Sequence, residues 1–342
     1  MLFDLRPKER KEDLFGREEE LRRLESFLDN MLGAIVYGIR RIGKTSLVKV
    51  YCSEYGRCAY VDVRGLYDRG ITVNAFIEEL LKGVRSLNDR IPSLEVDLRV
   101  LRFKREKKSK ALSEVLEELD KRSMILVIDE AQLLRGNKVF SNVFAWALDN
   151  LSNLKIIFSG SEVGVLEKYL GLRDPSSPLY GRGLGELKLS KFSLELSTEF
   201  LRKGFEEVGM EVPEEEIEEA GKELGGIVGW LTLYGNLRLN GLAHEEALIR
   251  TKERAKKIIA LELKNFLDLR PMGRKRYCCI LRAIALGLRA WKDIKKYCND
   301  QNDKNFTNAL NKLIDYSFIE KVEHEYLMVD PLMRDAILDV CK

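Results

Sequence analysis

The feature that most limits what this chain can fold into is a glycine-containing segment between an aliphatic run and a helix. The segment GIRRIGKT occupies residues 38–45 and fits the pattern G-x-x-x-x-G-K-[ST]. Residues 34–37 before it have the aliphatic character of a buried strand, and residues 45–50 after it have helical character. A strand, a tight loop and a helix in this order are typical of a parallel α/β sheet.

The residues of this loop are suited to hold phosphate groups. Glycines let backbone N–H groups wrap around phosphates, and the helix N-terminus adds the positive end of its dipole. Lys44 is predicted to reach the β- and γ-phosphates and the Thr45 hydroxyl to bind magnesium, so we expect ATP or ADP and Mg²⁺ as cofactors. The alternative is an ordinary glycine turn before a helix. The predicted nucleotide-binding residues of the loop are Gly38, Ile39, Arg40, Arg41, Ile42, Gly43, Lys44, Thr45 and Ser46.

Two carboxylates follow a second aliphatic run. Asp129 and Glu130 come directly after residues 124–128, and open α/β sheets bind ligands at the carboxyl ends of their strands. Asp129 is predicted to hold magnesium, and Glu130 to orient and activate a water for in-line attack on the γ-phosphate. A kinase has no need of a water activator, so the pair favours hydrolysis over transfer to a substrate. The alternative is a strand that merely ends in solvated acids.

Another predicted strand end carries hydroxyl side chains, and an arginine-flanked loop follows it. Ser159 and Ser161 come after aliphatic residues 154–158, and Ser159 is predicted to place a hydroxyl near the γ-phosphate; a simple turn is the alternative. Arg173 and Arg182 flank a loop rich in proline, serine and glycine. Such a loop is suited to carry a positive charge to the phosphates of its own or a neighbouring subunit. We predict this role for Arg182 and a solvated position for Arg173.

The order of the elements predicts an α/β P-loop NTPase fold, in which helices cover both faces of a parallel sheet. A small all-α lid domain and a C-terminal winged helix-turn-helix are predicted to follow. The predicted domains are residues 1–193, 194–268 and 269–342. The predicted strands of the sheet are 34–37, 59–63, 124–128, 154–158 and an edge strand at 186–189, with a helix over 73–84. The predicted winged-helix elements are helices near 277–286, 290–297 and 306–316, followed by a hairpin of 318–322 and 326–329.

Composition excludes several classes of protein. Of the 342 residues, 45% are apolar and 33% charged, which predicts a globular chain with a large core. The N-terminus is charged without an apolar h-region, and no run approaches the roughly 18 apolar residues of a membrane span. We therefore expect a cytoplasmic protein with no membrane partner. Six cysteines without a C-x-x-C pair and two histidines argue against a zinc site, and Cys278 and Cys279 are expected to fill the core.

Basic residues give limited support for nucleic acid as a partner. The net charge is only +3, and residues 270–342 hold 14 Lys and Arg against 10 Asp and Glu. This excess permits contact with double-stranded DNA through residues 290–325, and a module that binds a protein partner or another copy of the chain is the alternative. A basic cluster within 99–110 is expected to be a solvated loop. The predicted DNA-facing residues are Lys292, Lys295, Lys296, Lys304, Asn305, Thr307, Asn308 and Lys312.

Taken together in this order, the motifs resemble those of archaeal AAA+-related ATPases of the STAND class, which are similar to origin-recognition and replication-initiation ATPases. The resemblance implies that Phe15 and Arg17 lie against the adenine, that Arg182 is the family's arginine after the sensor strand, and that GGIVGW contacts nucleotide from the lid. The family usually has proline where this chain has Val228. The segments that carry the resemblance are RPKERKEDLFGREEEL, YGIRRIGKTSL, ILVIDEAQ, IIFSGS, SPLYGR and GGIVGWL.

These observations predict a magnesium-dependent ATPase that acts as a molecular switch. ATP is expected to bind between the sheet domain and the lid, and its hydrolysis to change how the winged helix is presented. An ATP-binding regulatory or scaffold protein with little turnover, whose winged helix binds a protein, is the alternative.

Overall fold

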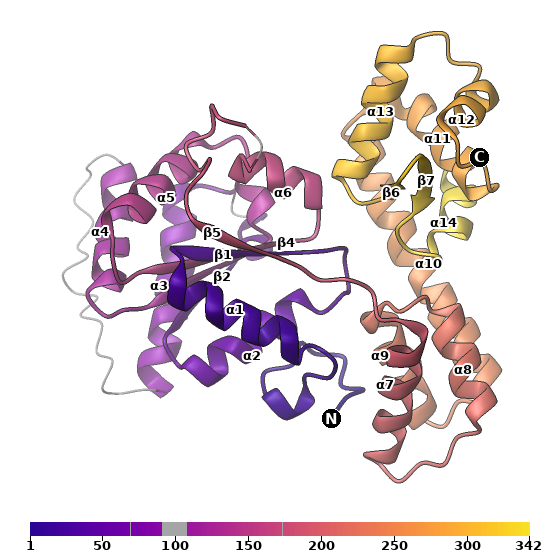
Figure 1. Ribbon diagram of the computed structural model, residues 1–342, viewed down its shortest axis with the longest axis horizontal. Coiled ribbons are helices and arrows are strands. Elements are labelled where there is room, and N and C mark those ends of the chain that lie inside the picture. The colour runs from indigo at the N-terminus through magenta and orange to yellow at the C-terminus, as the bar shows by residue number, and fades with distance from the viewer. Residues whose placement is uncertain (69, 91–107, 173) are drawn as a thin grey trace. The chain divides into compact units, whose positions relative to one another are not determined.

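The computed structural model describes residues 1–68, 70–90, 108–172 and 174–342. The chain forms two compact units, one of Pro7–Leu189 and one of Met1–Arg6 together with Ser190–Lys342 (Figure 1). The further division of the second unit at residue 268 stays a prediction. Arg173 and residues 99–107 of the basic cluster lie outside the described residues.

A five-stranded sheet forms the centre of the first unit. All of its paired strands run parallel, in the order β2-β3-β4-β1-β5, which confirms the predicted parallel sheet, including the edge strand. The order places β4 between β1 and β3, so the ends of these three strands are neighbours. The strands are β1 (Gly33–Tyr37), β2 (Cys58–Asp62), β3 (Ile125–Asp129), β4 (Lys155–Gly160) and β5 (Leu184–Lys188).

Helices cover both faces of this sheet because alternate residues of each aliphatic strand point to opposite sides. Ala34 and Val36 of β1 pack with buried residues of α1 and α2. Ile35 lies between them in sequence and packs on the other face, among buried residues of α3, α4, α5 and α6 (Figure 1). The helices are α1 (Glu18–Asn30), α2 (Lys44–Tyr55), α3 (Val73–Arg90), α4 (Lys108–Asp120), α5 (Lys138–Asn150) and α6 (Val163–Leu170), with 3-10 turns η1 (Lys11–Asp13), η2 (Val63–Leu66) and η4 (Ala131–Leu134).

Helix α3 is longer than predicted. It continues to Arg90, whereas the sequence pattern predicted an end near residue 84. Leu87 continues the apolar spacing three residues after Val84, and no glycine or proline interrupts the chain between Gly83 and Pro92. A helix continues through polar residues until such a stop signal, which explains the difference.

The second unit begins with helices that enclose the N-terminal residues of the chain. Phe3 is fully buried, and a Cβ at Gly204 or Gly235 would lie 2.2 or 2.4 Å from its ring. Asn236 Nδ2 also donates to the Phe3 carbonyl oxygen at 3.1 Å. The first six residues therefore pack with this unit and not with the sheet. Its helices here are α7 (Leu194–Glu206), α8 (Glu214–Glu223), α9 (Val228–Leu239) and α10 (His244–Asp268).

The C-terminal part of this unit has the predicted order of three helices and a hairpin. The hairpin is antiparallel and pairs Ile319 with Met328. Trp230 in α9 donates from Nε1 to Asp330 Oδ2 at 2.8 Å, and both side chains are buried, so a hydrogen bond joins the GGIVGW segment to the residues that follow the hairpin. The elements are η5 (Pro271–Gly273), α11 (Arg274–Ala285), α12 (Trp291–Cys298), α13 (Asp303–Asp315), β6 (Ile319–Val322), β7 (Glu325–Met328) and α14 (Met333–Val340).

The cysteines are paired, and the prediction that Cys278 and Cys279 fill the core is wrong. Both are only partly buried and form disulfides. Consecutive helical residues point about 100° apart, so these neighbours on α11 reach different partners, one after α14 and one at the end of α12. The disulfides are Cys52–Cys58, Cys278–Cys341 and Cys279–Cys298, with Cα–Cα distances of 5.4, 5.0 and 5.6 Å.

Candidate active site

The loop between β1 and α2 has a backbone that requires glycine at two positions. At Gly38, a Cβ would lie 2.6 Å from the Leu189 carbonyl oxygen. Gly43 has a φ of 100°, a left-handed conformation that glycine adopts without strain. No atom lies within 4 Å of the position that a Cβ would take at Gly43. Open space therefore adjoins the N-terminus of α2, where backbone N–H groups and the helix dipole stabilise an anion.

Lys44 is folded back onto this loop. Its Nζ donates to the carbonyl oxygens of Gly38 and Ile39 at 2.9 and 2.8 Å, and the residue is only 5% exposed. Burial lowers the pKa of Lys44 to about 8; the carboxylates of Glu130 and Asp129 oppose the shift, and other nearby cations add to it. The ammonium is thus poorly solvated and held by two neutral acceptors, so a phosphate would be a stronger partner.

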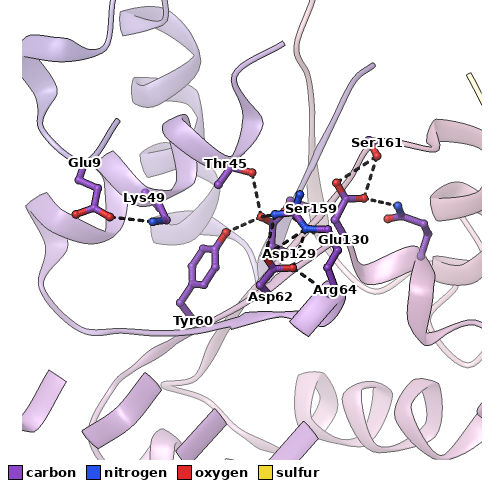
Figure 2. Close-up of polar contacts among 11 residues, drawn as sticks. Glu9, Thr45, Lys49, Tyr60, Asp62, Arg64, Asp129, Glu130, Ser159 and Ser161 are labelled. Carbon is purple, nitrogen blue, oxygen red and sulfur yellow. Dashed lines mark hydrogen bonds and ion pairs between the residues drawn. The ribbon is translucent and has the colours of Figure 1, made fainter. Parts of the chain in front are cut away.

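Asp129, at the end of β3, accepts hydrogen bonds from three hydroxyl groups (Figure 2). Its Oδ2 accepts from Thr45 Oγ1 at 3.0 Å and from Tyr60 Oη at 2.5 Å. Its Oδ1 accepts from Ser159 Oγ on β4. The side chain of Asp129 is only 1% exposed. The carboxylate is therefore fixed in position by side chains from three neighbouring elements, α2, β2 and β4.

The donors around Asp129 fit magnesium. A hydroxyl and a carboxylate are hard oxygen ligands of the kind that Mg²⁺ prefers, and Thr45 and Asp129 already touch. Within the described residues, no group of three or more His, Cys, Asp or Glu could hold a metal ion. Magnesium in nucleotide sites usually takes one or two protein ligands and completes its coordination with substrate phosphates and water, and Thr45 and Asp129 could supply the protein ligands.

Glu130 lies beside Asp129 but has different partners. Its backbone is left-handed, with a φ of 56°, and its N–H donates to Asp129 Oδ1 at 3.1 Å. Its Oε2 accepts from Ser161 Oγ at 2.9 Å and also from the Gln132 amide. Both carboxylates at this strand end are therefore oriented by neighbouring side chains.

Sequence reasoning missed Tyr60, Asp62 and Arg64, which come from β2 and the turn after it. In the register of the sheet, Asp62 pairs with Asp129, so β2 ends at the same edge as β3. Arg64 donates to Asp62 from both Nε and Nη2, and its Nη2 lies 4.0 Å from Asp129 Oδ2 (Figure 2). The rule that located Asp129, polar residues at the end of an aliphatic strand, also applies to Asp62 and could have found it.

Two of the loop's polar side chains contact neighbouring segments. Arg40 Nη2 donates to Glu162 Oε1 at 3.0 Å, and Glu162 follows β4. Ser46 Oγ accepts from the backbone N–H of Lys8 at 3.1 Å. Arg41 has a left-handed φ of 65°. These contacts fix the shape of the loop from the strand side and from the N-terminal side.

Arg17 supports the same loop from the segment before α1. Its Nη2 donates to the carbonyl oxygen of Ile42 at 3.2 Å, and its Nη1 donates to Glu20 at 2.6 Å. Phe15, half-buried, lies two residues earlier, next to Gly16 with a φ of 64°. The FGRE segment thus lies against the phosphate loop, and the predicted contact of Phe15 and Arg17 with adenine stays a prediction.

The partner of Arg182 in the structure is Asp149, and not Asp129 or Glu130. Its Nε and Nη2 donate to the two oxygens of Asp149, at the end of α5, at 2.8 and 2.5 Å. Both side chains are partly exposed. The predicted role of Arg182 toward phosphate in its own or another subunit stays a prediction.

A glycine-containing loop after β1 and two acids at the end of β3 lie at the same edge of a parallel sheet, and this arrangement defines a P-loop ATPase fold. Residues 14–233 match the family described as an ATPase domain predominantly from Archaea, and the chain belongs to this family. A Walker-type ATPase of Pyrococcus abyssi is 38% identical, with a TM-score of 0.88 over 99% of this chain and 100% of that one. The predicted family resemblance is confirmed. Residues 271–329 match the C-terminal winged helix-turn-helix domain of MCM proteins, which confirms the predicted winged helix.

More distant relatives extend beyond this chain. An uncharacterized protein of Methanocaldococcus jannaschii is 26% identical over 312 residues, which cover 89% of this chain and 61% of that protein. The chain thus spans about three fifths of that relative's length. A STAND protein of Pyrococcus horikoshii with a tetratricopeptide repeat sensor is 18% identical, with a TM-score of 0.44 over 98% of this chain and 44% of that one. Within the described part of the chain, no helix has the length and apolar character needed to cross a membrane.

Proposed function

We propose that the protein binds and hydrolyses ATP with magnesium and acts as a nucleotide-dependent switch in the cytoplasm. The observation that carries the proposal is the convergence of Lys44, Thr45, Asp129 and Glu130 at one edge of the sheet. Lys44 and the N-terminus of α2 supply positive charge for phosphates, and Asp129 and Thr45 supply oxygen ligands for magnesium. Family membership supports the same conclusion.

Each residue has a role that follows from its contacts. Lys44 would exchange its two carbonyl acceptors for phosphate oxygens, which are stronger partners for an ammonium. Thr45 and Asp129 would hold magnesium, which neutralises phosphate charge when it is bound. Glu130 would accept the proton of the attacking water, because its carboxylate is the acid beside Asp129 that is not directed at Thr45. Ser159 would keep Asp129 oriented.

Nucleotide binding tests this proposal directly. Isothermal titration with ATP should show binding in the presence of magnesium and a large loss in Lys44→Ala. Lys49→Ala is the matched control, because Lys49 lies on the same helix and pairs with Glu9. An unchanged affinity in Lys44→Ala, or no binding by the wild-type protein, would contradict the proposal.

A second candidate is an ATP-binding regulatory protein with little turnover. The observation that favours it is that Ser161 and Gln132 both donate to Glu130, so the proposed base is already hydrogen-bonded. In this case Glu130→Gln would leave a near-zero rate of phosphate release unchanged. A clear drop in the rate would exclude this candidate.

We further propose that the winged helix contacts double-stranded DNA through residues 290–325. Lys304, Asn305 and Asn308 of α13 are exposed and suited to meet phosphates or base edges. Thr307 is less suited, because it is half-buried and accepts from Trp291 Nε1. Titration of duplex DNA at two salt concentrations tests the proposal, because phosphate contacts weaken with added salt. No binding at either concentration would favour a protein partner for this domain.

A further inference from the structure

The ends of β2 and β3 bring a cation beside the proposed catalytic acids. Arg64 follows β2 in η2, and its guanidinium lies 2.8 Å from Asp62 Oδ2 and 4.0 Å from Asp129 Oδ2. Its side chain is 57% exposed, whereas Asp129 is buried. The charge of Arg64 is thus available to a molecule that enters the site from solvent.

The strand order defines which part of a nucleotide would meet this arginine. The phosphate loop follows β1, and Asp129 is the last residue of β3, which lies on the far side of β4 from β1. Strand β2 lies beyond β3, so Arg64 is farther from the loop than Asp129 along the sheet edge. Thr45 at the end of the loop donates to Asp129, so a triphosphate anchored at the loop would direct its terminal phosphate toward Asp129.

We propose that Arg64 contacts the γ-phosphate in its own subunit and stabilises the charge that develops there during hydrolysis. The inference rests on the ATP site proposed above and assigns it a further catalytic residue. The proposal differs from the role predicted for Arg182, whose guanidinium is paired with Asp149.

Asp62 prepares Arg64 for this contact. The carboxylate accepts from the Arg64 backbone N–H at 3.0 Å as well as from Nε and Nη2. This paired fork holds the guanidinium next to Asp129 before any ligand arrives. The γ-phosphate would compete with Asp62 for the same donors, because arginine binds phosphate and carboxylate through the same planar geometry.

The negative charge of the carboxylates around the site also favours a second cation beside Lys44. Asp129, Glu130 and Asp62 place three carboxylates near the position of a highly charged ligand. Lys44 of the phosphate loop is buried, and its Nζ donates to two carbonyl oxygens of that loop. A guanidinium stays protonated throughout the physiological range, so Arg64 supplies charge that does not depend on pH.

The test compares ligands with and without a third phosphate. Affinities for ADP and for a non-hydrolysable ATP analogue, both with magnesium, are measured by isothermal titration for wild type, Arg64→Gln and Arg64→Lys. Arg122→Gln is the matched control, because Arg122 makes a similar pair with Glu118 outside the site. A thermal melt of each variant reports folding.

In Arg64→Gln, loss of a charge-assisted contact to the γ-phosphate should lower the affinity for the ATP analogue about tenfold or more. The affinity for ADP should change by less than about twofold. Arg64→Lys should fall between wild type and Arg64→Gln, because it keeps the charge without the fork. Arg122→Gln should match wild type for both ligands. The hydrolysis rate of Arg64→Gln should fall about 100-fold or more.

Equal losses for ADP and the analogue, or no loss for either, would overturn the proposal and leave Arg64 a partner of Asp62 only. If Arg64→Gln melts at a lower temperature than wild type, the Arg64→Lys variant provides the test. A ratio of ADP affinity to analogue affinity in Arg64→Lys equal to that of wild type would overturn the proposal. Failure of the ATP site itself has a different signature, because wild type would then bind neither ligand.

Discussion

The buried ammonium of Lys44 predicts that nucleotide affinity falls as pH rises through about 8. In the free protein burial lowers the pKa of Lys44 to about 8, and bound phosphates would raise it again. Above this pH, ATP binding therefore requires Lys44 to take up a proton. Below this pH, Lys44 is already protonated in the free protein, and the affinity for ATP is at its highest. At about pH 9 roughly one molecule in eleven carries a charged Lys44, so ATP should bind about tenfold more weakly than at about pH 7, a loss of about 1.4 kcal/mol.

The same shift has the opposite sign for folding. The unfolded chain binds a proton on this lysine up to its ordinary pKa of 10.5, whereas the folded chain releases it near 8. Stability that depends on Lys44 therefore rises with pH between these two values, because the unfolded state holds more protons there. Weaker binding at high pH would thus not reflect unfolding caused by this residue.

Isothermal titration of ATP at saturating magnesium, in steps from about pH 7 to about pH 9.5, measures the effect. Lys44→Arg is the control, because a guanidinium stays charged across this range and any remaining affinity should not depend on pH. A wild-type affinity that stays flat through this range would refute the argument. A fall of the same size in Lys44→Arg would also refute it, because the titrating group would then lie elsewhere.

Two further predictions concern contacts that the sequence did not reveal. Tyr60→Phe removes a donor to the buried Asp129 carboxylate, so the free energy of unfolding should fall by about 1.5–3 kcal/mol in urea titrations; a change below about 0.5 kcal/mol would contradict this contact. Cys278–Cys341 closes a loop with a sequence separation of 63, so its removal by Cys278→Ser with Cys341→Ser should destabilise the second unit by about 4 kcal/mol. Mass spectrometry after alkylation should find no free thiol before reduction, and labelled cysteines in the unreduced protein would contradict the pairing.

The sheet and the phosphate loop were predictable because local signals define them. A continuous aliphatic run as short as residues 124–128 indicates a buried strand, and the glycines on either side of the phosphate loop indicate a tight turn. The position of Ser159 at the end of a strand also followed from local reasoning, because an aliphatic run precedes it, whereas its contact with Asp129 depends on the pairing of β3 with β4. The winged helix was predictable from its three amphipathic helices and the short hairpin that follows them.

The contacts of the site that depend on strand order were not predictable. Arg64 is close to Asp129 only because β2 is the neighbour of β3, and one sequence does not state which strands pair. In the same way, Arg182 lies in the loop before an edge strand, yet its partner Asp149 lies 33 residues earlier on helix α5. Such pairings arise from the packing of whole elements.

The disulfides were not predictable for a related reason. Six cysteines allow fifteen complete pairings, and the sequence contains no rule that selects one. Cys278 and Cys279 looked like packing residues because apolar neighbours surround them in sequence. Their partners lie 63 and 19 residues farther along the chain, so only the folded arrangement reveals them.

The most direct test of the central claim is the rate of phosphate release from ATP with magnesium, measured for wild type and Glu130→Gln at equal nucleotide occupancy. The proposed mechanism predicts measurable turnover in wild type, no turnover when magnesium is chelated, and a loss of about 100-fold or more in Glu130→Gln without loss of ATP binding. Equal rates in the two proteins would contradict the role of Glu130 as the base that activates water.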